Sequence, residues 1–173
     1  MKVSIITVSF NSADTIKDTI KSVIDQDHKN IEHIIIDGGS QDDTLQIINK
    51  YKDKIDLIIS EPDNGIYNAM NKGIMLATGD IIGILNSDDF YIDNGVVSKI
   101  VSAFNSKNVE SVYSDLIYVN SSDLSKGVRL YSSENFAPGL LPYGIMPAHP
   151  TFFVKREIYK KYGVFKEDYK ILA

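Results

Sequence analysis

Short apolar runs rich in β-branched residues alternate with amphipathic helical stripes along residues 1–106, and this alternation restricts the fold more than any other feature. Each run has the composition of a strand that is covered on both faces. The clearest helical stripe extends from Ile66 to Ala77. Because strands that alternate with helices are joined by crossover connections, we predict an α/β fold with a mostly parallel, Rossmann-like sheet flanked by helices. The predicted strands are 3–8, 31–36, 55–59 and 80–85.

The pattern changes after residue 106. Short β-like runs occur near 112–119 and 128–131, and a loop rich in Pro and Gly follows at 137–150. A chain of 173 residues fits one buried core, and no repeat, low-complexity tract or linker divides it. We therefore predict a single domain. Its two halves are a regular part, 1–106, and a mixed, loop-rich part, 107–173.

Composition excludes several classes of protein. The chain has no cysteine, so a disulfide framework, a thiolate metal site and a cysteine nucleophile are excluded. The net charge of −5 argues against a nucleic-acid partner, because such proteins are more often basic. No stretch approaches the roughly 18 apolar residues that would span a bilayer. The apolar start is better interpreted as a strand than as a signal peptide.

Polar residues follow each predicted strand at the point where it ends. In an open parallel sheet, ligands bind outside the carboxyl ends of the strands. Three of the four strand ends carry carboxylates, which indicates a binding site at this edge. The four segments are Ser9–Asn11, Asp37–Ser40, Glu61–Gly65 and Asn86–Asp89.

Asp88 and Asp89 are adjacent carboxylates after a strongly apolar strand. Neighbouring carboxylates repel each other, and a divalent cation relieves that repulsion. Oxygen ligands in a chain without cysteine favour Mg²⁺ or Mn²⁺ over Zn²⁺. The alternative is that both residues cap the next helix, and the residues alone leave the two interpretations open.

The turn Asp37-Gly38-Gly39-Ser40 follows the second predicted strand. One interpretation is a tight turn with Ser40 as the N-cap of the next helix. The other adds Asp37 as an acceptor for an N–H or hydroxyl group of a ligand. The chain has neither a G-x-G-x-x-G after its first strand nor a Walker A motif. The charge of a diphosphate would then be met by a metal, which the Asp88–Asp89 pair could hold.

Seven segments match one known pattern in order and spacing: Val3–Asn11, Ile36–Thr44, Ser60–Gly73, Ala77–Asp80, Leu85–Asp89, His149–Phe153 and Tyr162–Phe165. Together they resemble the family 2 glycosyltransferases of the GT-A fold, in particular those that build bacterial surface polysaccharides. Each motif alone is short, but the set is highly specific and covers nearly the whole chain.

The resemblance implies a nucleotide-diphosphate sugar donor, a divalent metal (Mn²⁺ or Mg²⁺) and inversion at the anomeric carbon. It makes 1–106 the nucleotide-sugar-binding half and 107–173 the acceptor-side half. Asp89 is then the principal metal ligand, with Asp88 near the metal or the ribose. His149 is a candidate contact of metal, phosphate or acceptor, with a structural role as the alternative. The residues placed at the nucleotide sugar are Val8, Ser9, Asn11, Asp37, Gly65, Asn68, Asn71, Asn86 and Asp88.

The resemblance also bears on the catalytic base. In relatives, the segment that matches 163–173 leads directly into an acidic residue, usually an aspartate followed by an aromatic residue. The base is therefore expected just after Ala173, which implies that the chain is truncated there and would bind donor better than it transfers sugar. Asp168 is the alternative within the chain.

The implied function is inverting transfer of a sugar from a nucleotide-diphosphate sugar to a glycan or lipid-linked acceptor in polysaccharide or cell-envelope biosynthesis. Two alternatives stay open. One is a sugar nucleotidyltransferase, although the Gly-rich basic loop usual for that class is absent at 9–12. The other is a non-catalytic nucleotide-sugar-binding fragment. Because nucleotide sugars are made in the cytoplasm, we expect a cytoplasmic protein without a transmembrane segment. Peripheral association with the inner membrane face is a further alternative.

Overall fold

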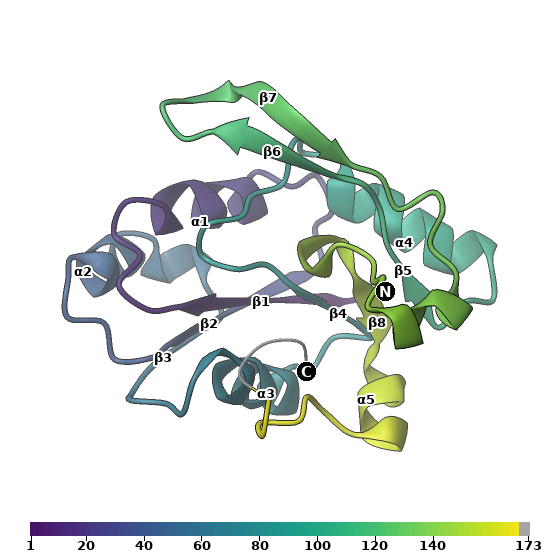
Figure 1. Cartoon of the computed structure of the whole chain (residues 1–173). Coiled ribbons are helices and arrows are strands. Elements are labelled where there is room, and N and C mark those ends of the chain that lie inside the picture. The colour runs from purple at the N-terminus through teal and green to yellow at the C-terminus, as the bar shows by residue number, and fades with distance from the viewer. Residues whose placement is uncertain (170–173) are drawn as a thin grey trace.

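A six-stranded sheet forms the centre of the fold within residues 1–169, the part of the chain that the computed structural model describes (Figure 1). Its strand order is β3-β2-β1-β4-β8-β5. The strands β1 to β4 are parallel, whereas β8 is antiparallel to both β4 and β5. The predicted α/β fold with a mostly parallel sheet is therefore confirmed. The strands are β1 Val3–Ser9, β2 Ile31–Asp37, β3 Leu57–Ser60, β4 Ile81–Ile84, β5 Ser111–Val112 and β8 Phe153–Lys155.

Helices cover both faces of this sheet (Figure 1). On one face, α4 packs against Ile5 and Ile81, and α1 and α2 pack against Ile35. On the other face, α3 packs against the neighbouring side chains of β1, β2 and β4, with α5 beside it. Because helices cover both faces, every residue of β1 is buried, including the polar residues Ser4, Thr7 and Ser9. The helices are α1 Ile16–Ile24, α2 Thr44–Asn49, α3 Ile66–Leu76, α4 Val96–Ser106 and α5 Arg156–Tyr162.

The late strand β8 lies between β4 and β5. Gly83 in β4 leaves room for the ring of Phe153, because a Cβ atom at Gly83 would lie 2.4 Å from Phe153 Cε1. Phe153 is fully buried there and stacks on Tyr91. The glycine inside this strand is therefore explained by the close approach of a ring from the neighbouring strand.

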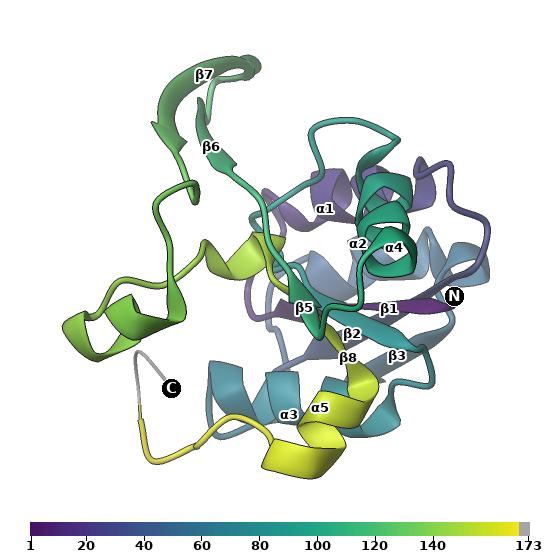
Figure 2. The ribbon, with the colours of Figure 1, turned by 90° about the vertical axis from the view of Figure 1, so that its right-hand side faces the viewer.

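A separate hairpin projects from the body of the fold (Figure 2). It consists of β6 (Leu116–Asn120) and β7 (Asp123–Tyr131), and nearly all of β7 is exposed. Two short 3₁₀ segments, Pro138–Tyr143 and His149–Thr151, follow it and lead into β8. The second half is therefore mixed and rich in loops, as predicted. Within residues 1–169, none of the helices combines the length and the apolar character needed to cross a bilayer.

A buried carboxylate joins segments at the amino ends of the strands. Glu32 on β2 accepts hydrogen bonds from Lys2 Nζ at 2.7 Å and Ser4 Oγ at 2.5 Å. It also accepts them from the backbone N–H of Thr78 at 2.8 Å and from its hydroxyl at 2.5 Å. Burial alone would raise the pKa of Glu32, but these hydrogen bonds outweigh it and lower the pKa to about 2. The network therefore holds together the amino-terminal edge of the sheet, whereas a ligand is expected at the carboxyl-terminal edge.

Candidate active site

Three polar side chains lie in register at the carboxyl ends of neighbouring strands. Ser9 of β1 pairs with Asp37 of β2, and Asp37 pairs with Ser60 of β3. The strands are parallel, so all three residues lie at the same edge of the sheet. The edge predicted from the sequence is therefore present. Val8, one position before Ser9, is buried in the core beneath this edge.

Asp37 is completely buried, and both of its carboxylate oxygens accept hydrogen bonds from the protein. Oδ1 accepts from Ser9 Oγ at 3.1 Å and Ser40 Oγ at 2.5 Å. Oδ2 accepts from Ser60 Oγ at 2.8 Å and from the backbone N–H groups of Gly39 and Ser40. Because a carboxylate has about four acceptor positions, these donors already occupy them. Asp37 therefore organises the turn, and its direct contact with a nucleotide base stays a prediction.

Ser40 does not cap the next helix, so that part of the sequence prediction is wrong. The helix α2 begins at Thr44 with Asp43 at its N-cap position. The Ser40 hydroxyl donates to Asp37 and accepts from the backbone N–H of Asn11 at 2.8 Å. Gln41 N–H in turn donates to Asn11 Oδ1 at 2.9 Å. These bonds hold Asn11 in the left-handed region, with φ of 49°, which is uncommon for a residue other than glycine.

Phe10 and Asp63 lie beside the Asp37 turn, and sequence reasoning did not single out either of them. Phe10 is 63% exposed although it directly follows a buried strand. A Cβ atom at Gly38 would lie 2.7 Å from Asp63 Oδ2 and 3.4 Å from the Phe10 ring. The absence of a side chain at Gly38 therefore makes room for both neighbours. An aromatic residue between two polar residues, directly after an apolar strand, was the sequence signal that could have identified Phe10.

The acidic pair lies where the chain leaves β4. Backbone bonds from Leu85 N–H to Ile6 O and from Ser87 N–H to Val8 O extend the β4 pairing with β1. Ser87 is fixed further by Ser12 Oγ at 2.7 Å and by a bond from Thr19 Oγ1 to its carbonyl. Asp88 and Asp89 follow at once, so they start from a rigid support at the sheet edge.

The environment of Asp89 disfavours its negative charge. Burial raises the pKa of Asp89 to about 6, with a further rise from the neighbouring Asp88, and a hydrogen bond from Asn86 only partly opposes this. Asp88 itself is exposed. A half-buried carboxylate next to a second carboxylate is an arrangement that a cation would stabilise.

Carboxylates such as these two are the ligands that a hard divalent cation prefers. Asn86 Oδ1 and His149 Nε2 are buried and have no hydrogen-bond partner among residues 1–169. Burial lowers the pKa of His149, so its imidazole is neutral near pH 7, which is the form that binds metals. The described part of the chain, however, contains no group of three or more His, Asp or Glu residues placed to hold a metal together. Two protein carboxylates are thus available, and further ligands would have to come from elsewhere.

A cavity of about 700 Å³ adjoins the acidic pair. Asp88, Asp89 and His149 line it from the body of the fold, and Ile117 and Leu130 line it from the hairpin. The structure therefore brings His149 into the same cavity as the two aspartates, as its predicted role at the site requires. A contact of His149 with a metal, a phosphate or the acceptor stays a prediction.

The predicted donor residues on α3 bind another part of the chain. Asn71 is buried; its side chain donates to the Phe165 carbonyl and to Glu167 Oε1, both at 2.9 Å, and accepts from Phe165 N–H. Asn68 Nδ2 donates to Glu167 Oε2 at 2.9 Å. Gly65 lies at the N-cap of α3 with φ of 108°. Asn68 and Asn71 therefore hold the segment after α5 against α3, and their contacts with a nucleotide sugar stay predictions.

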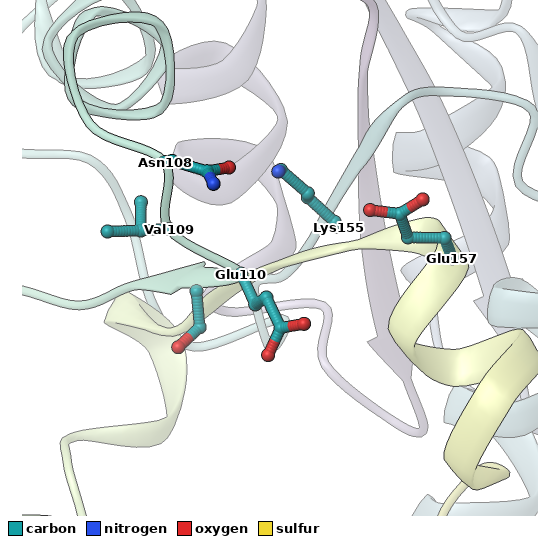
Figure 3. Close-up of a pocket in the computed structure, with 6 residues that line it drawn as sticks. Asn108, Val109, Glu110, Lys155 and Glu157 are labelled. Carbon is teal, nitrogen blue, oxygen red and sulfur yellow. The ribbon is translucent and has the colours of Figure 1, made fainter.

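The expected catalytic base lies outside the described residues, since it was predicted to follow Ala173. Asp168, the alternative, is exposed. It lines neither the cavity beside the acidic pair nor a second cavity elsewhere on the protein. The second of these cavities, of about 510 Å³, is a shallow hollow lined by Glu110, Lys155 and Glu157 among others (Figure 3). Lys155 pairs with Ile81, the first residue of β4, so this hollow lies at the opposite end of β4 from the acidic pair.

These features define a class of protein. An open sheet with an acidic carboxyl edge, followed by a mixed half that forms a cavity next to that edge, is the arrangement of a GT-A glycosyltransferase, and the similar solved structures belong to that class. The sequence profile of glycosyl transferase family 2 matches residues 4–163, and the chain belongs to this family.

Individual relatives agree with this assignment. The Escherichia coli UDP-Glc:alpha-D-GlcNAc-diphosphoundecaprenol beta-1,3-glucosyltransferase WfaP is 41% identical over 99 residues, which cover 57% of this chain and 39% of that protein. S. aureus TarS 1-349 in complex with UDP has a TM-score of 0.79 at 23% identity, covering 99% of this chain and 52% of that one. The Pyrobaculum calidifontis mannosyltransferase PcManGT with GDP-Man and Mn²⁺ has a TM-score of 0.73 at 18% identity, covering 96% and 48%. The chain thus spans about half the length of these proteins or less.

Proposed function

We propose that this chain forms the donor-binding part of an inverting glycosyltransferase. The enzyme would transfer a sugar from a nucleotide-diphosphate sugar to a glycan or lipid-linked acceptor in polysaccharide or cell-envelope biosynthesis. The observation that carries the proposal is the position of Asp88 and Asp89, at the edge shared with the Asp37 turn and beside a cavity. Family membership supports it, as do the TarS complex with UDP and the E. coli relative, whose name specifies a lipid-linked acceptor.

The nucleotide would lie at the ends of β1 and β2. Asn11 would supply a polar side chain of this surface, Val8 and Ser9 would support it from beneath, and Asp37 would fix its shape. Phe10 adds an exposed ring at the same place. Every nucleobase has an aromatic face, so such a ring can stack on the base.

Replacing Phe10 by Ala should weaken nucleoside diphosphate binding by about 10-fold, because base–aromatic stacking contributes about 1–3 kcal/mol. Isothermal titration calorimetry with UDP and GDP measures the effect. Phe10→Tyr, which keeps the ring, is the matched control and should bind like the wild type. Equal affinities for the wild type and Phe10→Ala would show that the base lies elsewhere.

Asp89 and Asp88 would hold Mn²⁺ or Mg²⁺, with Asp89 as the principal ligand. Diphosphate oxygens and water would supply the other ligands, since such ions often retain water and bind substrate phosphates. The bound cation would stabilise the negative charge that develops on the departing diphosphate. The mannosyltransferase structure that contains GDP-Man and Mn²⁺ supports this assignment.

Inversion further needs a base that removes the acceptor hydroxyl proton on the sugar face opposite to the diphosphate. We retain the expectation that this base follows Ala173, with Asp168 as the alternative. The contacts of Asn68 and Asn71 with Phe165 and Glu167 suit this role, because they fix the segment that leads toward that point.

A thermal-shift screen of nucleoside diphosphates, with and without Mn²⁺, tests the proposed function. Occupancy at about 100 times the dissociation constant stabilises the folded state by about 2.7 kcal/mol. We expect one nucleotide to raise the melting temperature by several degrees, and more so with Mn²⁺. No stabilisation by any nucleotide at millimolar concentration would contradict the proposal.

Product analysis separates the two alternatives. A glycosyltransferase releases nucleoside diphosphate from a nucleotide sugar, whereas a sugar nucleotidyltransferase releases pyrophosphate from a nucleoside triphosphate and a sugar phosphate. A fragment that only binds releases neither. We further propose that the reaction takes place in the cytoplasm, on account of its donor, with the inner membrane face as the place of a lipid-linked acceptor. Recovery of the native protein from an exported compartment by fractionation would contradict this location.

A further inference from the structure

The cavity beside the acidic pair is mainly apolar. Leu85 and Phe153 line its base, and Ile117 and Leu130 line it from the hairpin. Its volume of about 700 Å³ is that of a small-molecule site, not of a protein-sized interface. A sugar presents hydroxyl groups to its surroundings, so the donor sugar alone does not account for such walls.

The charged residues at this cavity are all of one sign. Asp88, Asp89 and Asp115 line it, and no Lys or Arg is among the described residues that do. A phosphate or carboxylate group inside it would be repelled by these side chains, at short range and with reduced solvent screening. The cavity therefore favours a neutral ligand, apart from the edge where a cation would bind.

Two buried polar atoms at this cavity lack partners within residues 1–169. They are His149 Nε2 and Tyr91 Oη. An unpaired buried polar atom costs about 1–3 kcal/mol, which a hydrogen bond from a ligand would recover. A few polar groups within apolar walls are the usual composition of a site that orients one small molecule.

We propose that this cavity binds the neutral apolar group of the acceptor, an aryl or alkyl aglycone, with the acceptor hydroxyl directed toward Asp88 and Asp89. The proposal rests on the proposed function, because the acidic pair defines which end of the ligand reacts.

The test compares ligands that differ only in the aglycone. Dissociation constants of phenyl, octyl and methyl β-D-glucoside are measured by ligand-observed NMR, with octyl glucoside below its micelle concentration, and geranyl diphosphate serves as the anionic probe. We expect the phenyl and octyl glucosides to bind about 10-fold more tightly than the methyl glucoside, in line with the apolar area buried. Geranyl diphosphate should bind more weakly than octyl glucoside. Equal binding of all three glucosides, or tighter binding of geranyl diphosphate, would overturn the proposal.

A pair of hairpin variants locates the binding. Leu130→Asp places a charge in the cavity wall, whereas Val128→Asp places the same charge two residues away on β7, outside the lining. Leu130 and Val128 are 61% and 59% exposed, so both variants should fold. Leu130→Asp should abolish the preference for phenyl over methyl glucoside, and Val128→Asp should retain it. If Leu130→Asp fails to fold, Ile117→Ser provides the same comparison.

Two parallel measurements distinguish aglycone binding from nucleotide binding and from self-association. In the first, UDP and GDP are titrated into the same samples. Nucleotide binding without a preference for the phenyl or octyl aglycone would refute the cavity assignment alone. A preference for these aglycones without nucleotide binding would refute the proposed function. Sedimentation is measured as a function of concentration. A dimer that Leu130→Asp dissociates would show that a second copy fills the cavity, which would overturn the proposal.

Discussion

Asp89→Asn should lower the affinity for nucleoside diphosphate in the presence of Mn²⁺ by about 100-fold or more, since even residues that only support metal ligands contribute about 10- to 100-fold. The same variant should be more stable than the wild type without metal. Burial and Asp88 raise the pKa of Asp89 to about 6, so its ionised form is disfavoured in the folded state at pH 7. Removing that charge should stabilise the fold by about 1–3 kcal/mol.

The gain in stability from Asp89→Asn should depend on pH. Because the folded pKa of Asp89 is raised above the ordinary 3.8, its contribution to stability is complete below pH 3.8 and is lost as pH rises toward 6. Urea denaturation at pH 4 and pH 7 should therefore show a larger gain for Asp89→Asn at pH 7. Asp53→Asn, in an exposed turn before β3, is the matched control and should change neither quantity. Metal-dependent nucleotide binding that persists in Asp89→Asn would refute its role as a ligand.

Glu32→Ala should destabilise the protein by about 3 kcal/mol, because one pKa unit corresponds to about 1.4 kcal/mol and the pKa of Glu32 falls from 4.5 to about 2 in the folded protein. The side chain of Glu32 is only 10% exposed. Its loss would leave the Ser4 hydroxyl and the Thr78 N–H without their acceptor and Lys2 without its counter-ion. Urea denaturation at pH 7 measures this, and a loss below about 1 kcal/mol would mean that water replaces the carboxylate at little cost.

The effect of Glu32 should also depend on pH in a defined window. Its folded pKa of about 2 lies below the ordinary 4.5, so the stabilisation is complete above pH 4.5 and is lost as pH falls toward 2. The difference between the wild type and Glu32→Gln should therefore shrink across this range. Glu134→Gln, an exposed carboxylate on the loop after β7, is a control in which no such trend is expected.

The periodicity of the sequence was sufficient to predict most of the strands and helices in the first half of the chain. Strands β1 to β4 and helix α3 lie close to their predicted positions, because runs buried on both faces and apolar stripes are local signals. The site edge could be predicted for the same reason, as it follows from where parallel strands end. The small end-shifts, such as β3 beginning at Leu57 instead of residue 55, reflect the weak local signals at element boundaries.

The contacts of the individual site residues could not be predicted, because they join distant parts of the chain. Asp37 is bound by hydroxyls from β1 and β3 as well as from its own turn. Asn71 binds Phe165, 94 positions later. Ser40 fits an N-cap by residue type, but a buried carboxylate three positions earlier competes for its hydroxyl. Such competition is decided by tertiary packing and leaves no pattern in the sequence.

The position of β8 has a consequence for the order in which the molecule assembles. Its partner β4 precedes it by about seventy residues, as the pairing of Gly83 with Phe153 shows. Closing so large a loop costs entropy before the pairing returns any stability, so this step should follow the collapse of β1 to β4. On the ribosome, the edge that carries Asp37 would form while Gly83 still faces solvent. His149 would reach the cavity beside the acidic pair only once Phe153 inserts, so β8 would close this cavity after the edge has formed.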